Sequence, residues 1–76
     1  MIDKRVGERV REARLKYQPK LTQLDLAAQL QTRGYDLDNS MISKIESGDR
    51  RISSTELFVI AKVLKVTPNW LLDFTE

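Results

Sequence analysis

The sequence predicts an all-α domain built from five short helices. Apolar residues recur at helical spacing along the whole chain, and no segment alternates apolar and polar residues as a half-buried strand would. Each of the five segments begins or ends at a residue typical of a helix terminus. The segments are too short and too unequal for the seam of a coiled coil. With 76 residues, the chain is expected to form one domain over residues 1–76.

The first predicted helix begins near Asp3, a candidate N-cap, and continues to Tyr17. Its apolar residues at i, i+4, i+7 and i+11 form one stripe for the core: Val6, Val10, Ala13 and Tyr17. Pro19 ends the helix, because the residue before a proline is driven out of the α conformation.

The second predicted helix begins at the candidate N-cap Thr22, and Asp25 lies at the acidic position of a capping box. The residues expected to face the core are Leu26, Ala27 and Leu30. Leu24 lies off this stripe and is expected to be partly exposed. Gly34 can adopt a positive φ, so we expect the helix to end there.

The third predicted helix starts at Asp38 or Asn39 and ends at Gly48. Its expected core contacts, including one residue just before the helix, are Leu37, Met41, Ile42 and Ile45. The other face carries small polar residues, so this helix buries little apolar surface and would be marginally stable alone.

Ser53 and Glu56 predict a capping box at the start of the fourth helix. Apolar residues at core spacing follow, and three more widen the apolar face: Leu57, Ile60, Ala61 and Leu64, then Phe58, Val59 and Val63. This helix is therefore expected at the centre of the domain. The fifth helix begins with Thr67 as N-cap and Pro68 at the first helical position. Its apolar residues, expected in the core or partly in a dimer interface, are Trp70, Leu71, Leu72 and Phe74.

Basic residues are concentrated near the N-terminus. The formal net charge is only +2, and the isoelectric point is about 9.2. Residues 1–20 carry seven basic and three acidic residues, a local charge of +4, whereas residues 21–52 and 53–76 each carry −1. A solvated helix face accounts for most such runs, and a surface for a polyanion is the sharper interpretation.

The composition excludes several classes of function. The chain has no cysteine and no histidine, so disulfides and the usual zinc sites are excluded, and a reducing cytoplasm is the expected compartment. No apolar run is long enough to span a bilayer, and the N-terminus lacks the apolar region of a signal peptide. The acidic residues lack the spacing of metal or acid–base sites. We therefore predict a protein that is not an enzyme and needs no cofactor and no metal.

Two neighbouring helices carry the strongest functional signal. Segments 22–33 and 39–47 are typical of a helix-turn-helix over residues 22–47, in which the second helix lies in the major groove of DNA. Side chains that face the groove must be short or able to hydrogen-bond base edges. The polar face of the second helix of this pair offers such side chains: Asn39, Ser40, Ser43 and Lys44. Ile42 and Ile45 hold the opposite face to the core.

In their order and combination, four segments resemble the helix-turn-helix domains of the lambda-repressor/Cro type, the XRE family: VGERVREARL, LTQLDLAAQL, NSMISKIESGDRRIS and ELFVIAKVLKVTPNWLL. The resemblance extends from about Val6 to Leu72 and implies a compact five-helix, lambda-repressor-like DNA-binding domain. It further implies a transcriptional repressor from a bacterium or phage. Such a protein binds a palindromic operator in double-stranded DNA as a homodimer, with half-sites about one helical turn apart.

By position, the resemblance implies a role for each polar residue of the motif. Base contacts are implied for Asn39, Ser40, Ser43 and Lys44. Phosphate contacts are implied for Thr22, Gln23, Ser47, Asp49, Arg50 and Arg51. Arg14 is implied to pair with Glu46, which would position the arginine and fix the third helix.

One long connection departs from the family pattern. Segment Gln31–Leu37 lengthens the link between the two helices of the motif by about five residues relative to the family. We expect the second helix to continue for a turn to Gly34, followed by a loop over residues 35–37. The insertion interrupts no apolar stripe, so the fold is expected to survive, while the tilt of the third helix is not predicted.

Two other functions stay open. An antitoxin with the same domain would autoregulate its operon and bind a toxin or another effector protein. A helical interaction module without DNA binding is favoured by three acidic residues near the motif, Asp36, Asp38 and Asp49. Considered alone, Lys44 could be an exposed lysine without a binding role, and Asn39 could simply cap the helix.

Overall fold

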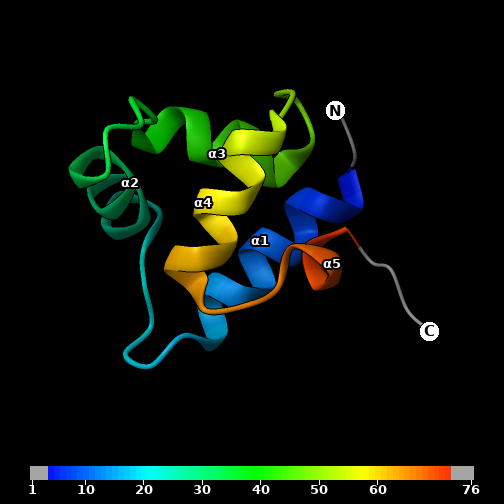
Figure 1. Cartoon of the computed structure of the whole chain (residues 1–76), viewed down its shortest axis with the longest axis horizontal. Helices are drawn as coiled ribbons and strands as arrows, with labels where there is room; N and C mark the ends of the chain where they lie inside the picture. Colours follow the sequence, from blue (N-terminus) through cyan, green and yellow to red (C-terminus); the bar gives the residue numbers. More distant parts are fainter. Residues whose placement is uncertain (1–3, 73–76) are drawn as a thin grey trace.

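The computed structural model describes residues 4–72, and these residues form five helices and no strand (Figure 1). The helices are α1 (Lys4–Lys16), α2 (Gln23–Thr32), α3 (Asn39–Ser47), α4 (Ser54–Leu64) and α5 (Pro68–Leu71). The predicted all-α, five-helix fold is therefore confirmed. The candidate N-cap Asp3 and the apolar Phe74 lie outside the described residues.

Helix α4 lies at the centre of the domain, between α2 and α5 (Figure 1). Its inner residues are buried, and Ile60 is completely inaccessible to solvent. Helix α1 packs against α3, α4 and α5, and α2 packs against α3 and α4. The largest fully buried side chains come from all five helices: Val6, Val10, Leu26, Leu30, Ile42, Ile60 and Leu71. The apolar stripes predicted from helical spacing therefore meet in one core.

The helix ends follow the predicted capping chemistry. Thr22 and Asp25 form a capping box on α2, and Ser53 and Glu56 form another on α4. The Asp38 carboxylate caps α3 by accepting a hydrogen bond from the Met41 N–H at 2.8 Å. The predicted stops behave likewise: Gly34 and Gly48 adopt positive φ of 86° and 85°.

Two predictions for individual residues need correction. Helix α1 ends at Lys16 rather than Tyr17, because Pro19 prevents the last residues from forming a further helical turn. Phe58 was expected to widen the buried face of α4, yet 59% of its surface is exposed. Leu24 is 66% exposed, as its position off the stripe predicted.

The insertion between α2 and α3 is anchored at both ends. The Tyr35 N–H donates to the Leu30 carbonyl, and the Leu37 side chain is buried in the core. Gln31 Nε2 also donates to the Leu37 carbonyl at 3.1 Å. These contacts bring the chain back onto the core one residue before the cap of α3, so the longer link still delivers a positioned helix.

Candidate nucleic-acid interface

Helix α3 presents its predicted base-contacting side chains to solvent. Ile42 and Ile45 are buried beneath the helix. The four polar residues predicted to contact bases are all exposed: Asn39, Ser40, Ser43 and Lys44. Within residues 4–72 their side chains make no hydrogen bond and no ion pair. The donors and acceptors on this face are therefore available to an external partner.

The chemistry of this face suits a base edge. An amide can pair with adenine at two atoms, an ammonium can donate to guanine, and hydroxyl groups can donate or accept. The major groove is about 12 Å wide, which admits a helix. Because α3 has only nine residues, it can reach a few base pairs at most.

Helix α3 is held by a close approach of α1. Gly7 lies so near the end of α3 that a Cβ atom there would overlap the carbonyl oxygen of Ile45 and lie 2.9 Å from that of Glu46. A Cβ on Gly48 would in turn lie 3.3 Å from the Lys4 Cα. Sequence reasoning missed the role of Gly7, because a glycine within a helix pattern does not reveal which neighbour it contacts.

A buried ion pair joins α1 to α3, and the predicted partners Arg14 and Glu46 form it. Arg14 Nε donates to Glu46 Oε2 at 2.8 Å, and Arg14 Nη2 donates to Oε1 at 3.0 Å. The remaining arm of the guanidinium, Nη1, donates to the Leu21 carbonyl at 3.0 Å. The arginine is 7% exposed and the glutamate 6%. This bidentate geometry fixes the orientation of both side chains.

The same carboxylate holds the first residue of α2. Gln23 Nε2 donates to Glu46 Oε1 at 3.0 Å, so one glutamate connects α1, α2 and α3. Thr22 stands just before Gln23, and its hydroxyl is used by the cap, where it accepts from the Asp25 N–H at 3.0 Å. The N-terminus of α2 thus reaches the edge of the exposed face of α3 in a fixed position.

The loop after α3 is folded back on the helix end. The Lys44 carbonyl accepts from the N–H groups of Asp49 and Arg50 at 2.8 and 3.1 Å. The Arg50 side chain is partly buried and paired with Glu56, with Nη1–Oε1 and Nη2–Oε2 distances of 3.0 and 3.3 Å. Arg51 is exposed, and its side chain has no ion pair within the described residues. The two adjacent arginines therefore differ in availability.

The side chains of Ser47 and Asp49 are hydrogen-bonded to each other. The Ser47 hydroxyl faces two acceptors, Asp49 Oδ2 at 2.9 Å and the Lys44 carbonyl at 3.1 Å. With its amide bonded to Lys44, Asp49 has no free donor for a phosphate. In this geometry the pair shapes the loop.

Two acidic residues of the caps have lowered pKa values. The Thr22 N–H donates to Asp25 Oδ2 at 3.0 Å, and this bond, together with the adjacent Thr22 side chain, lowers the pKa of Asp25 below its ordinary value. Burial raises the pKa of Glu56, but hydrogen bonds from Arg50 and Ser53 outweigh it, so the net pKa is lowered. Both carboxylates are therefore charged in the folded protein at neutral pH.

Arg11 was not singled out by the sequence, and the structure places it beside the motif. A hollow of about 250 Å³ opens between α1, the start of α2 and α3. Its lining residues are Arg11, Gln23, Ser43, Glu46 and Ser47. The signal was present in the spacing: Arg11 is four residues after Gly7 and three before Arg14, and both of these contact α3.

Residues 4–72 contain neither a cluster of metal-ligating residues nor a membrane-spanning helix. No group of three acidic, cysteine or histidine residues is arranged to hold a metal ion in this part of the chain. None of its helices is both long and apolar enough to cross a bilayer.

Comparison with known proteins identifies the family. No curated protein and no solved structure gives a significant match to the chain. The family model described as helix-turn-helix matches residues 10–71, which is more than half of the chain and includes α2 and α3. The chain therefore belongs to the Cro/C1-type (XRE) helix-turn-helix family of DNA-binding transcription regulators.

Proposed function

We propose that this regulator is a repressor that binds a palindromic operator as a dimer, with α3 in the major groove. The observation that carries the proposal is the exposed polar face of α3, whose side chains have no partner within residues 4–72. Repression requires only that a bound protein occupy an operator that overlaps a promoter. The DNA-binding surface is sufficient for that role.

The proposed base contacts follow from side-chain chemistry. Asn39 would pair with adenine and Lys44 with guanine, while Ser40 and Ser43 would bond to either. Asn39 and Ser40 lie in the first turn of α3, directly after the cap. Each good bidentate contact discriminates against a wrong base by about 1–3 kcal/mol.

The proposed phosphate contacts surround this face. Thr22 and Gln23 lie at the N-terminus of α2, where backbone N–H groups favour an anion. Two exposed arginines add positive charge: Arg51 in the loop after α3, and Arg11 beside the hollow that Ser43 and Ser47 of α3 also line. The ion pair of Arg50 with Glu56 favours a role in holding the loop. Ser47 and Asp49 are likewise assigned to the shape of the loop.

The dimensions of the domain support a dimer. Half-sites in this class of complex lie about 34 Å apart, one turn of B-DNA. The domain measures 33 × 26 × 19 Å, so two copies side by side can present α3 to successive major grooves on one face of the duplex. A nine-residue helix contacts too few bases to be selective alone, and a second copy doubles the site.

Selection from a random duplex library tests the proposal. The 76-residue chain is expected to enrich a palindrome, and log affinity is expected to fall linearly with log salt. Lys44→Ala should weaken the enriched site, whereas Lys62→Ala, which removes an exposed lysine of α4, serves as the matched control. A library without any enriched sequence, or equal losses for both variants, would contradict the proposal and favour an interaction module.

A further inference from the structure

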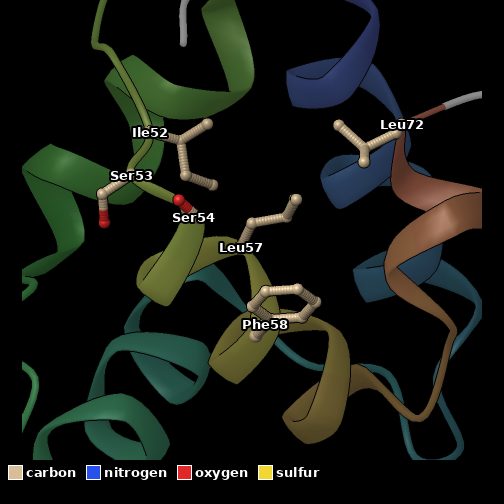
Figure 2. Close-up of a pocket in the computed structure, with 6 residues that line it drawn as sticks. All are labelled: Ile52, Ser53, Ser54, Leu57, Phe58 and Leu72. Carbon is tan, nitrogen blue, oxygen red and sulfur yellow. The ribbon is translucent and has the colours of Figure 1, made fainter.

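Phe58 is a large apolar side chain in an unusual position. It is 59% exposed on α4, beside a hollow of about 200 Å³ (Figure 2). Figure 2 shows Ile52, Leu57 and Leu72 around this hollow, with Phe58 on its rim. A single water occupies roughly 30 Å³ in the liquid, so the hollow has room for a side chain. A protruding ring and an apolar hollow thus lie on one surface.

Among the described residues, the lining of this hollow carries no charge. The remaining lining residues are Ser53 and Ser54, so none of the six is ionisable. The second hollow that borders Phe58 differs, because Arg33 and Lys62 line it. A two-fold axis brings identical residues near one another, and like charges there repel. The uncharged hollow suits a second copy of this chain, and the cationic one does not.

The surface is also continuous with the proposed DNA-binding loop. Ile52 and Ser53 directly follow Arg51, the proposed phosphate contact. A two-fold axis at the hollow therefore brings the loops of both copies together. Both copies of α3 can then face the same side of the pair, as a palindromic site requires.

We propose that Phe58 of one copy inserts into the hollow of a second copy, and that the second copy does the same in return. This is an isologous contact, in which one surface supplies both the ring and the hollow. The inference rests on the proposed dimer and specifies its interface. An interface of standard size buries about 800 Å² per partner, roughly a sixth of the 4893 Å² surface of this domain.

Sedimentation of the 76-residue chain from about 1 µM to 1 mM tests the interface. We expect a monomer–dimer equilibrium, and Phe58→Ala should raise its dissociation constant roughly thirtyfold, as loss of an interface hot spot does. Leu24→Ala is the matched control, because Leu24 is 66% exposed and lies on α2. Its dissociation constant should equal that of the unmodified chain.

A second variant guards against an effect of Phe58 on folding. Ser54→Glu places a carboxylate at the hollow, and this position in the first turn of α4 favours an acidic residue, so the helix should form normally. The variant should keep the helical circular dichroism and lose the dimer.

A failure of the proposed interface can be distinguished from a failure of the proposed dimeric repressor. A dimer that both variants leave intact overturns this interface, while the proposed dimeric repressor stands. A chain that stays monomeric at 1 mM also overturns the interface. The proposed operator is judged separately, by whether the library selection yields a palindrome.

Discussion

Replacing Glu46 with leucine should cost a large part of the stability of this domain. Leucine fills much of the volume of the glutamate side chain but leaves the guanidinium of the buried Arg14 without its carboxylate. Removing one partner of a buried pair costs about 3–5 kcal/mol. A domain of this size is stable by only about 4–11 kcal/mol. The midpoint of thermal unfolding should therefore fall by at least about 12 °C.

A double-mutant cycle separates the buried charge from the contact itself. Arg14→Met alone should be similarly costly, because Glu46 then loses its cation. The double variant, Arg14→Met with Glu46→Leu, leaves no uncompensated charge and should lie within about 2 kcal/mol of the unmodified chain. Urea unfolding followed by circular dichroism measures all four corners of the cycle.

The control is an exposed ion pair on α1, the helix that carries Arg14. Lys16 Nζ lies 2.9 Å from Glu12 Oε2, yet the two side chains are 73% and 45% exposed. Lys16→Met should leave the unfolding midpoint nearly unchanged, because water screens this pair. If the double variant instead loses the sum of the two single losses, the reasoning from uncompensated charge is refuted.

Three other variants test separate parts of the structure. Gly7→Ala should lower the midpoint of thermal unfolding, because the new Cβ atom overlaps the Ile45 carbonyl at a cost of about 1–3 kcal/mol. Alanine also gains roughly 1 kcal/mol in helix propensity, which offsets part of this cost. A higher midpoint would contradict the close approach of α1 to α3. The stability that Glu56 contributes should be present above pH 4.5, its ordinary pKa, and be lost as the pH falls through the lower folded-state pKa. Stability should therefore depend less steeply on pH in the acid range for Glu56→Gln than for the unmodified chain. An unchanged acid transition would argue against the lowered pKa. In filter-binding assays, Arg51→Ala should reduce the slope of log affinity against log salt by about 1, and an unchanged slope would remove Arg51 from the proposed phosphate contacts.

The helix ends and the core were predictable because they depend on local chemistry. Capping residues such as Ser53 and Glu56 act within one turn, and the apolar stripes have a fixed period. The pair Arg14–Glu46 joins residues 32 positions apart, and it was predicted only through the resemblance to a family. Neither the composition nor the spacing of residues predicts this pair.

The features that escaped prediction depend on how helices meet in space. The contact of Gly7 with the end of α3 requires the packing of α1 on α3. The exposure of Phe58 depends on which part of α4 the other helices cover, because its neighbours on α4 are apolar as well. The ion pair between Arg50 and Glu56 depends on the path of a loop that folds back onto α3. Each of these is a property of tertiary arrangement.

The acidic residues near α3 oppose DNA binding only if all of them are counted as free charges. Asp38 caps the N-terminus of α3, where the helix dipole is positive. Glu46 is buried beneath the surface and balanced by Arg14. Lys44 and Arg51, in contrast, carry positive charge on exposed side chains that have no ion pair within residues 4–72. The charge presented to a duplex is therefore more positive than the local sum, and Asp38, one of the three acidic residues that favoured an interaction module, is explained by the helix cap.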